Sequence, residues 1–590
     1  MANLSQEKRK KMLDFLETLK QQHSDDESLM AINQIEKELT AKKYGLVWEE
    51  HEEEVDVKMQ THIPVFTEDK EKEIVGNPES DEYNFLLEGD NLHSLKLLEK
   101  THKGKIDVIY IDPPYNTLKE GFTYSDQLVD GSDLFRHSKW ISFMGTRLKI
   151  AKQLLSKKGI IFMSVDENEY AQLKLLCDEI FGEKCFIENI IWNKRVPKND
   201  KGIGNIHEYI LTYANDTEYK YKLMIPKEGL SDIEQLLHQA KGNELNIADI
   251  EQELKMLYKN GNYPRAITLY NNLDNEYRVF GKINMSWPNG NTFGPRYDVL
   301  HPLTGKPVKV PDRGWRWSQK TFEEAVDYEN KQILHDGSIL CGKIWFSKKD
   351  DMQPSSINYL SDVSRMLLRS IISLKSDGGM VVENIFNKKS VFAYPKSVTL
   401  IKMLIDACTY DNKDAVILDY FAGSGTTAQA VLELNSEDGG NRHIILCTNN
   451  EESICRSVTY PRIKTVILGR RIDGSIYSDG LPSNLKYYKT DFIPKDGEDL
   501  YDDLLNHIVE MIQLQYGVKV DNEKYVIIMD DDEMDEFEKN FQQYTELKAL
   551  FINQDVLLTT AQEKLLSNVN TYIIPDCYFD FELREAGELW

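Results

Sequence analysis

The stretch Lys105-Ile-Asp-Val-Ile-Tyr-Ile-Asp-Pro-Pro-Tyr115 joins a short apolar run directly to a polar motif. Its first eight residues are rich in β-branched and aromatic side chains, which predicts a buried strand. The alternation then continues with a helix predicted over Asp133–Leu155, a strand over Ile160–Val165, a helix over Ala171–Phe181 and a strand over Phe186–Trp192. Such alternation is typical of a parallel sheet covered by helices, so the sequence predicts an α/β fold.

The motif that ends the first strand, Asp112-Pro113-Pro114-Tyr115, suits chemistry on an amino group attached to an aromatic base. Such a nitrogen is a poor nucleophile because its lone pair is delocalised into the ring. The carboxylate of Asp112 and the carbonyl of Pro113 can accept hydrogen bonds from both N–H groups, which frees the lone pair. Proline's fixed φ holds that carbonyl in place, and Tyr115 can stack on a base swung out of its duplex. An ordinary Pro-Pro turn is the alternative.

The second motif, Asp419-Tyr-Phe-Ala-Gly-Ser-Gly-Thr426, lies between a strand predicted over Ala415–Leu418 and a helix predicted over Thr426–Leu434. Gly423 and Gly425 let the backbone approach a ligand closely, and the N-terminus of the helix favours a carboxylate such as that of S-adenosyl-L-methionine (AdoMet). The glycine spacing and the missing lysine argue against a nucleotide-phosphate loop. A plain turn that needs glycine is the alternative. The candidate cofactor ligands in this motif are Asp419, Phe421, Ala422, Gly423, Ser424, Gly425 and Thr426.

An acidic residue at the end of the next strand would hold the ribose hydroxyls of such a cofactor. That strand is predicted over His443–Thr448, and Glu451 follows it, with Asn449 and Glu452 as competitors.

Two further candidates for the cofactor site lie upstream of the glycine motif. Asp90, in Glu88-Gly-Asp-Asn-Leu92, can accept the adenine amino group of AdoMet, although a helix cap for the residues that follow fits equally well. Lys396 belongs to the segment Phe392-Ala-Tyr-Pro-Lys-Ser397, which leads into a predicted helix. Proline near a helix start is common, so this segment alone is a weak signal.

The composition of the chain bounds these interpretations. Its 590 residues are too many for a single hydrophobic core, so we expect several domains. The content of 41% hydrophobic and 10% aromatic residues indicates a folded protein. We find no run of 18 apolar residues and no apolar core of a signal peptide in Met1–Leu13, so we expect a cytoplasmic protein without membrane contact. The 7 cysteines form no C-x-x-C pair, and no His/Cys ligand cluster is present, so we expect reduced thiols and no metal.

The net charge of -26 speaks against a polyanionic partner at first sight, but its distribution matters more. Residues 191–400 carry roughly +4 and residues 491–590 roughly -17. In the middle of the chain, basic residues interleave with four tryptophans, and we take the aromatics mainly as core. The candidate DNA-binding residues are Arg296, Lys309, Arg313, Arg316, Lys343 and Lys348, for which a solvated basic rim is the alternative.

These motifs together resemble the β-class of DNA amino-methyltransferases, in which the catalytic motif precedes the AdoMet loop and target recognition lies between them. The fuller pattern resembles the modification (Mod) subunit of type III restriction–modification systems. One departure is Ser397, where the family pattern has a second proline. The supporting stretches are Leu87–Leu92, Ile109–Asn116, Ser138–Leu148, Gly314–Ser318, Gly342–Phe346, Asn484–Phe492 and the tail Ile574–Trp590.

The resemblance implies a Rossmann-like methyltransferase sheet with permuted motif order, an inserted target-recognition domain and a small C-terminal α/β domain. It also implies AdoMet as cofactor, N6 of adenine in double-stranded DNA as target, a Mod homodimer and a restriction (Res) helicase/nuclease partner. The expected units are an N-terminal helical, charged arm (1–80), the catalytic half (81–195), the recognition insert (196–385), the AdoMet-binding half (386–490) and a domain for dimer formation or partner docking (491–590).

Other functions stay open on the residues alone. The Asp-Pro-Pro-Tyr motif serves both amino bases, so N4 methylation of cytosine is an alternative, as is an orphan methyltransferase without a restriction partner. A non-catalytic DNA-recognition subunit is a third possibility, against which the intact motifs argue. Methylation of RNA or of a protein amide is the last, and the large insert favours DNA over it.

Overall fold

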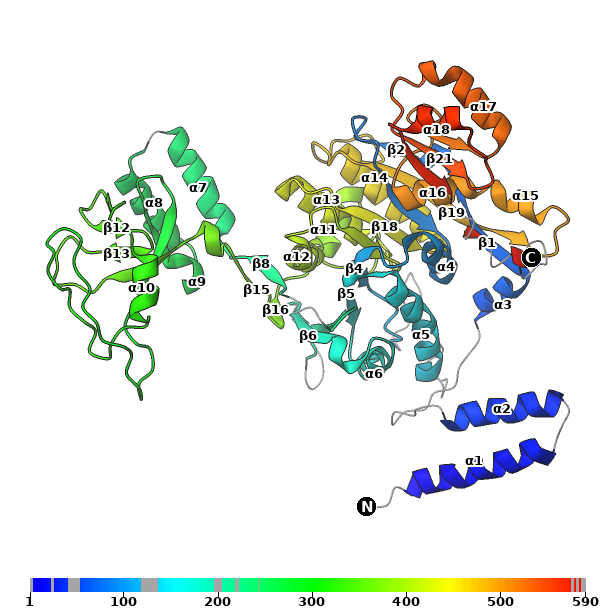
Figure 1. Cartoon of the computed structure of the whole chain (residues 1–590), viewed down its shortest axis with the longest axis horizontal. Helices are drawn as coiled ribbons and strands as arrows, with labels where there is room; N and C mark the ends of the chain where they lie inside the picture. Colours follow the sequence, from blue (N-terminus) through cyan, green and yellow to red (C-terminus); the bar gives the residue numbers. More distant parts are fainter. Residues whose placement is uncertain are drawn as a thin grey trace.

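A long mixed sheet forms the body of the protein, with two smaller units attached to it (Figure 1). The computed structural model describes residues 4–22, 26–40, 53–117, 136–195, 204–217, 222–243, 245–574, 578–579 and 583–584. The first residues of the helix predicted from Asp133 and most of the tail after Ile574 lie outside these ranges.

The main sheet follows the order β1-β19-β3-β18-β17-β4-β5-β7-β6-β16, with β2 pairing β19 beside this path. Neighbours from β19 to β5 are parallel, β1 is antiparallel to β19, and β7 is antiparallel to β5 and β6. The strands are β1 (His62–Glu68), β2 (Ile74–Val75), β3 (Asn84–Glu88), β4 (Ile106–Ile111), β5 (Leu155–Val165), β6 (Phe186–Asn193), β7 (His207–Ala214), β16 (Ile371–Ser373), β17 (Val416–Asp419), β18 (His443–Thr448) and β19 (Asn484–Pro494).

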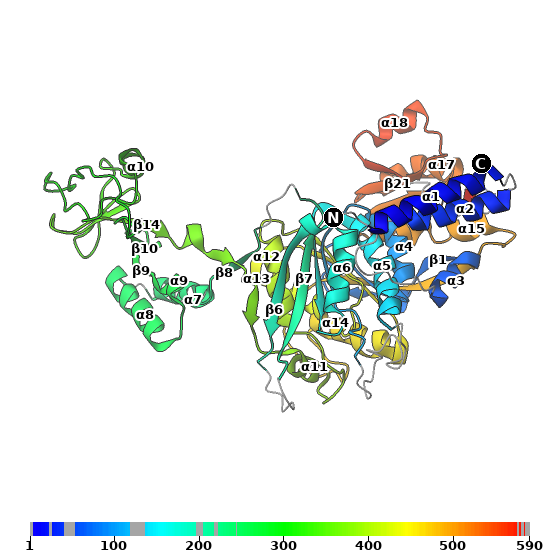
Figure 2. The ribbon, with the colours of Figure 1, turned by 90° about the horizontal axis from the view of Figure 1, so that it is seen from below.

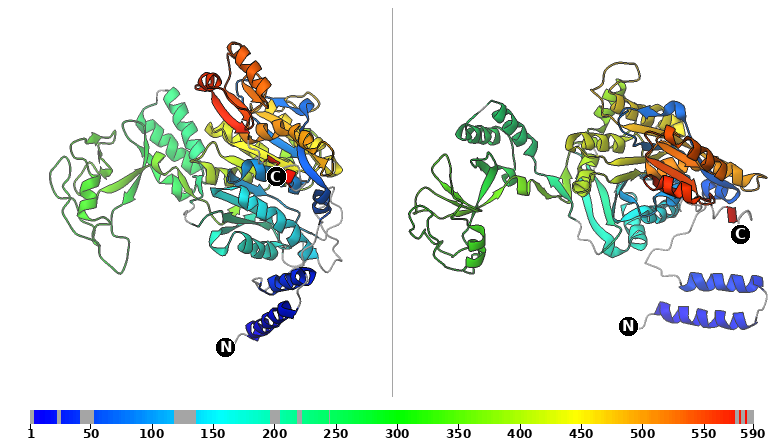
Figure 3. Two further views of the ribbon diagram at one scale, coloured as in Figure 1. Left: turned by 45° about the vertical axis from the view of Figure 1, so that its right-hand side comes forward. Right: turned by 45° about the horizontal axis from the view of Figure 1, so that its top comes forward.

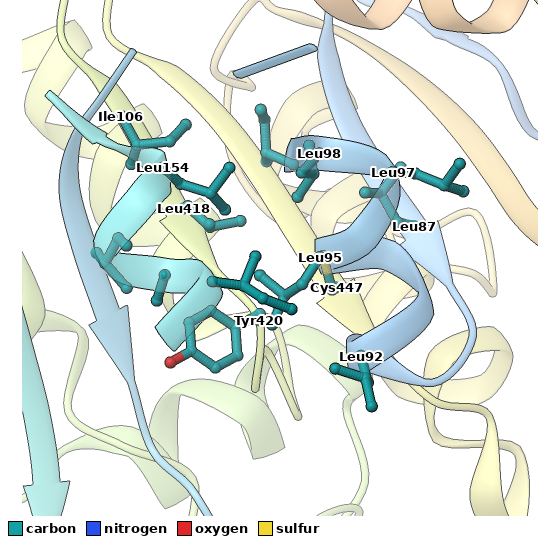
Figure 4. Packing of buried hydrophobic residues seen from close by; sticks show 14 of the residues in the cluster. Leu87, Leu92, Leu95, Leu97, Leu98, Ile106, Leu154, Leu418, Tyr420 and Cys447 are labelled. Carbon is teal, nitrogen blue, oxygen red and sulfur yellow. The ribbon is translucent and has the colours of Figure 1, made fainter. Parts of the chain in front are cut away.

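Each face of this sheet is covered by its own set of helices. Alternate side chains of the strands point to opposite faces, so Ile109 and Ile111 of β4 enter one core while Val108 and Tyr110 enter the other. Figure 4 shows the first core, where leucines of α4 meet Leu418 and Cys447 of the sheet. This face carries α4 (Asn91–His102), α5 (Arg136–Leu154), α6 (Tyr170–Ile180) and α16 (Ile508–Tyr516); the other carries α11 (Gly378–Phe386), α12 (Val398–Thr409), α13 (Thr426–Asp438) and α14 (Tyr460–Leu468).

A separate lobe projects from the body on a two-stranded ribbon, as Figure 1, Figure 2 and Figure 3 all show. The ribbon is β8 (Met224–Pro226) paired with β15 (Arg365–Leu367). The lobe has its own cores and a six-stranded sheet in the order β11-β12-β13-β14-β10-β9. Its elements are α7 (Leu230–Gly242), α8 (Ile247–Asn260), α9 (Arg265–Thr268), β9 (Tyr270–Leu273), β10 (Val279–Asn284), α10 (Gln319–Ala325), β11 (Gln332–Ile333), β12 (Ile339–Cys341), β13 (Ile344–Phe346) and β14 (Ser355–Tyr359).

The two ends of the chain add smaller pieces. At the N-terminus, α1 (Leu4–Gln22) and α2 (Asp26–Thr40) run side by side, and α3 (Glu54–Thr61) leads into β1. Near the C-terminus, α15 (Leu500–Leu505) and α16 pack on the body, and a three-stranded parallel sheet follows. That sheet comprises β20 (Tyr525–Ile528), β21 (Ala549–Asn553) and β22 (Asn570–Ile574), with α17 (Asp531–Asn540) and α18 (Thr560–Leu566).

Three of the predicted domain boundaries are wrong. The arm predicted over 1–80 includes β1 and β2, which belong to the main sheet. The insert predicted over 196–385 includes β7, β16 and α11, which also belong to the body, so the lobe itself begins after β8 and ends before β15. The C-terminal unit predicted over 491–590 begins with the end of β19 and with α15 and α16, which pack in the main core. β1, β2, β16 and β19 pair with strands far away in sequence, which local pattern does not reveal, while β7 pairs with β6 directly before it.

None of the helices in the described part of the chain is long and apolar enough to cross a bilayer.

Candidate active site

The two predicted motifs meet where the winding of the sheet changes direction. β17 and β4 are adjacent and parallel, with Leu418 opposite Ile109. The chain leaves β17 into α13 on one face and leaves β4 towards α5 on the other. In open α/β sheets, ligands bind outside the carboxyl ends of the strands at such a switch point. Asp112 and the glycine motif both follow these ends, so the fold brings them together at the carboxyl ends of the strands, where such sheets have their crevice.

The Asp-Pro-Pro-Tyr motif is fixed from both sides. Trp140 of α5, which is fully buried, donates from Nε1 to the carbonyl of Pro114 over 2.7 Å. The Tyr115 hydroxyl donates to Oδ1 of Asp112 over 2.7 Å. Burial raises the pKa of Asp112, and the nearby ammonium of Lys396 opposes that rise. The motif therefore presents a carboxylate whose acceptor oxygen is already hydrogen-bonded within the protein.

The position of Tyr115 differs from the exposed stacking surface expected of it. Its side chain is 8% exposed, and its hydroxyl is engaged by Asp112 and by Lys396, whose Nζ lies 2.5 Å away. The ammonium also lies 4.7 Å from the ring centroid. Stacking on a base requires the ring to move from this arrangement, and the stacking role stays a prediction.

Lys396, which we predicted as a cofactor ligand, lies beside the Asp-Pro-Pro-Tyr motif. Its Nζ is 3.1 Å from Oδ1 of Asp112 and 2.7 Å from Oε2 of Glu208, and it is one-tenth exposed. Glu208, near the start of β7, was not predicted at all. A buried carboxylate inside a strand is a rare feature, but a single sequence gives no sign of that burial.

The glycine motif has the backbone shape that its residues predict. Gly423 (φ 48°) and Gly425 (φ 78°) are left-handed, and Gly425 caps α13. A side chain at Gly423 would have its nearest neighbour, Cζ of Phe392, 3.7 Å away, so the loop leaves room beside its backbone. Asp419 accepts from the amide of Phe421 at 3.0 Å and from the Thr427 hydroxyl at 2.5 Å. Burial raises the pKa of Asp419 to about 7.

The model of the DNA methylase family matches residues 106–459, well over half of this chain and both motifs. The chain belongs to the DNA methylase family.

Relatives and a solved structure extend this comparison. The type III restriction–modification enzyme EcoP15I Mod subunit of Escherichia coli is 32% identical over 391 residues, covering 60% of this chain and 56% of the relative. The type II methyltransferase M.KpnI of Klebsiella pneumoniae is 31% identical over 438 residues, covering 69% of this chain and 90% of the relative. The PvuII DNA methyltransferase (cytosine-N4-specific) aligns with a TM-score of 0.31 at 11% identity, covering 64% and 86% of the two chains. The chain spans little more than half the length of the Mod relatives it matches.

A buried arginine of this methylase holds the glycine loop. Arg462 of α14 is fully buried and donates from Nη1 to the hydroxyls of Ser424 and Thr426, both at 2.9 Å. Its Nε and Nη2 both donate to Oε1 of Gln429. Among the described residues it has no carboxylate within salt-bridge distance, and burial lowers its pKa to about 10. Sequence analysis missed Arg462, although a lone arginine in the apolar helix around it was the available signal.

Asp90 performs the capping role that was its alternative interpretation. Its Oδ1 accepts from the amide of Leu92 at 2.8 Å, and the side chain is one-third exposed. Arg147 of α5, fully buried, lies 3.4 Å from the same oxygen and also pairs with Glu53 at 2.7 Å. The carboxylate of Asp90 therefore has a fixed position at the start of α4, and its role as a cofactor ligand stays a prediction.

Glu451 lies in a short turn after β18 and is exposed. The buried carboxylate at this edge is Glu88, at the end of β3, which accepts from the Tyr487 hydroxyl and pairs with Arg456 at 2.7 Å. Thr448 at the end of β18 pairs with Glu88 at the end of β3, so Glu451 and Glu88 lie at the ends of neighbouring strands. The competitor Glu452 has a left-handed backbone (φ 46°).

All six predicted DNA-binding residues lie in the lobe and are exposed. The tryptophans interleaved with them divide: Trp315 and Trp345 are buried in the lobe cores, while Trp287 and Trp317 are half-buried. This confirms the expectation that the aromatics are mainly core. Within the described residues, no group of three or more His, Cys, Asp or Glu side chains is arranged to hold a metal ion.

Proposed function

We propose that this protein is an AdoMet-dependent DNA methyltransferase that methylates N6 of adenine in double-stranded DNA, as the modification subunit of a type III restriction–modification system. One observation carries the proposal. The carboxylate of Asp112 and the glycine loop 423–426 follow adjacent parallel strands at the switch point of the sheet. An acceptor for an amino group and a cradle for a cofactor thereby share one crevice.

The crevice has donors and acceptors that fit AdoMet. The open backbone at Gly423 and the N-terminus of α13 suit the methionine carboxylate, and the buried guanidinium of Arg462 adds positive potential behind that loop. Asp90 suits the adenine amino group, and Glu451 or Glu88 the ribose hydroxyls. Bound AdoMet supplies a methyl group activated by its sulfonium charge.

The chain's own residues prepare the target nitrogen. Asp112 accepts one N–H of the amino group and the carbonyl of Pro113 accepts the other, which localises the lone pair on nitrogen. Trp140 holds the following carbonyl, that of Pro114, so the turn keeps its shape when the base enters. We propose that the Tyr115 hydroxyl releases Oδ1 of Asp112 as the base enters, which couples target entry to movement of Tyr115.

The choice of adenine and of the type III system rests on the relatives. Relatives from Escherichia coli and Salmonella typhimurium at 31–32% identity are named type III Mod subunits. We also propose a homodimer and a Res partner for this protein. We assign DNA contact to the exposed basic residues of the lobe. The acidic C-terminal unit around β20–β22 is the surface we propose for partner docking.

The test uses the purified protein with methyl-labelled AdoMet and mixed-sequence duplex DNA. After digestion to nucleosides, we expect the label in N6-methyladenosine of the deoxy series, and none above background with Asp112→Ala. Label in N4-methylcytosine would contradict the choice of adenine. Equal labelling by wild type and Asp112→Ala would contradict the assigned catalytic site.

A further inference from the structure

Four charged side chains form a continuous chain of contacts that ends at the carboxylate of Asp112. Lys194, just after β6, pairs with Oε1 of Glu208 on β7. Oε2 of the same Glu208 lies 2.7 Å from Nζ of Lys396, and that Nζ lies 3.1 Å from Oδ1 of Asp112. We call Lys194, Glu208, Lys396 and Asp112 the ion-pair cluster, because each charged group contacts the next group, which has the opposite charge.

The cluster has no net charge, and its two central side chains are poorly solvated. It holds two carboxylates and two ammonium groups; the Glu208 side chain is 9% exposed and that of Lys396 10%. Removing one member of a buried ion pair leaves a charge without its partner, which is far more costly than the pair itself is beneficial. The four residues come from separate segments of the body, so the fold assembles them at one place beside the catalytic motif.

Lys396 contacts Oδ1 of Asp112 directly, and Glu208 is linked to that carboxylate through Lys396 and through the Tyr115 hydroxyl, which lies 3.4 Å from Oε2 of Glu208. Lys396 has three N–H donors, directed to Asp112, Glu208 and the Tyr115 hydroxyl. When Tyr115 releases Asp112, the ammonium still has Glu208 as its anchor. The position of Lys396 is then fixed by Glu208 on β7 and not by Asp112.

We propose that Glu208, fixed by Lys194, is a positioning residue that holds Lys396 against Asp112, so that Asp112 stays ionised and can accept a hydrogen bond from the target amino group. This rests on the proposed function. Lys396 then acts on the catalytic carboxylate rather than as a cofactor ligand.

Several titratable groups face Asp112 and must be held constant in a test. Tyr115 and Tyr110 lie on its own segment, and Asp419 faces it from β17. Desolvation raises the pKa of Asp112, the ammonium of Lys396 opposes that rise, and the negative charge of Glu208 adds to it, so Glu208 favours ionised Asp112 only through the lysine that it holds. Asp166 after β5, whose pKa burial raises to about 6, interacts with Glu208 and will appear in any pH profile. Its contribution is common to wild type, Lys396→Met, Lys396→Arg and Lys402→Met, so the acid limb is compared among these proteins, and the Glu208→Gln variants are compared by rate.

The experiment measures single-turnover methyl transfer between pH 5.5 and 9 with saturating AdoMet and DNA, and AdoMet affinity by calorimetry. The variants are Lys396→Met, Lys396→Arg, Glu208→Gln and the double variant Lys396→Met/Glu208→Gln, which removes one charge of each sign and is the one best able to fold. Lys402→Met is the matched control, since Lys402 on α12 also pairs with two glutamates, at 3.5 and 2.6 Å, away from the crevice.

We expect the acid limb of the rate profile to move up by about one pH unit or more in Lys396→Met and to stay in place in Lys396→Arg and Lys402→Met. Glu208→Gln should lower the rate by roughly tenfold in the wild-type background and by less than about twofold in the Lys396→Met background, because it acts through that lysine. AdoMet affinity should change by less than about twofold throughout.

Three results would overturn the inference. One is an acid limb that stays unmoved in Lys396→Met while AdoMet affinity falls, which would make Lys396 a cofactor ligand. Another is an equal loss from Glu208→Gln in both backgrounds. The third is a loss that follows melting temperature alone, with no change in the pH profile. An inactive wild type would instead contradict the proposed function, so the two failures are distinguishable.

Discussion

Arg462 donates from Nη1 to the hydroxyl of Ser424 over 2.9 Å, reaching from helix α14 into the middle of the glycine loop. The same nitrogen lies 3.2 Å from the Ser424 carbonyl, so the guanidinium fixes both the side chain and the backbone of that residue. A loop that must approach a ligand with its backbone is thus held from behind by a buried cation.

The first prediction concerns this arginine. Arg462→Met removes both donors to Oε1 of Gln429 and the donor to the hydroxyls of Ser424 and Thr426, so we expect a loss of about 2–4 kcal/mol in stability. We also expect AdoMet affinity to fall by roughly tenfold or more, as measured by calorimetry. The exposed Lys464 on the same helix provides the control variant Lys464→Met, which should change neither quantity. Normal AdoMet affinity in Arg462→Met would show that the loop keeps its shape without the guanidinium.

The second prediction isolates the chemistry from binding. Asp112→Asn keeps the shape of the side chain but removes the anionic acceptor, so methyl transfer should fall by about 10²–10³-fold. AdoMet and DNA affinities, measured separately, should stay within about twofold. Asp107→Asn at the start of the same strand is the control and should retain turnover. Asp107 contacts Ser156 and Val416 at the amino ends of the strands, away from Asp112 at their carboxyl ends. A similar loss in both variants would point to damage of β4 instead.

A third prediction follows from His102, which is fully buried and whose pKa burial lowers to about 3. In the unfolded chain its pKa is about 6.5, so between these values the unfolded state binds a proton that the folded state does not. His102 therefore makes the protein lose stability as pH falls below about 6.5, by up to about 1.4 kcal/mol per pH unit. Urea unfolding at pH 7 and pH 5 should show a smaller loss in His102→Gln than in wild type. Equal losses in the two proteins would refute the assignment.

The fourth prediction concerns the ribbon that carries the lobe. Arg365 of β15 pairs with Asp406 of α12 at 2.5 Å and donates to the carbonyl of Met224 on β8, so it ties both strands to the body. Arg365→Gln should speed amide exchange in β8 and β15 and lower kcat/KM for DNA several-fold, with AdoMet affinity unchanged. Arg369→Gln, an exposed arginine nearby, should leave exchange as in wild type. Unaltered exchange in Arg365→Gln would mean that strand pairing alone fixes the lobe.

The fifth prediction tests the DNA contacts of the lobe. If Arg313 and Lys343 bind phosphates, each alanine variant should weaken DNA binding and reduce the slope of log K against log salt concentration by about 1. Lys259→Ala, an exposed lysine on α8 of the same lobe, should leave the slope unchanged. The measurement is a fluorescence titration at several salt concentrations. An unchanged slope for both variants would remove these residues from the interface.

Local sequence pattern predicted the central elements well. The strand predicted over 443–448 matches β18, and the helix predicted over 171–181 matches α6 within one residue at each end. These elements alternate or repeat apolar residues over their own length, so their type is visible locally. The motif positions at the strand ends then follow from parallel pairing.

What the sequence did not reveal depends on distant pairing or on buried charge. β7 was assigned to the insert because nothing local shows that His207–Ala214 pairs with both β5 and β6. Glu208 and Arg462 are charged residues, which are usually exposed; nothing local marks the burial of Glu208, and the apolar helix around Arg462 is the one local sign of its burial. The capping bond of Asp90 was among the two roles weighed for it, and its contact with Arg147 was not.

The pairing of β8 with β15 places the entrance and the exit of the lobe side by side, about 4.8 Å apart as in any pair of strands. A segment whose two ends are neighbours can be exchanged for another of different length without stretching the body that holds it. The lobe is therefore a unit that can be exchanged as a whole. Under the proposed function, exchange of the lobe at these two short strands would change the DNA sequence that is recognised and would leave the Asp112 motif and the glycine loop in place.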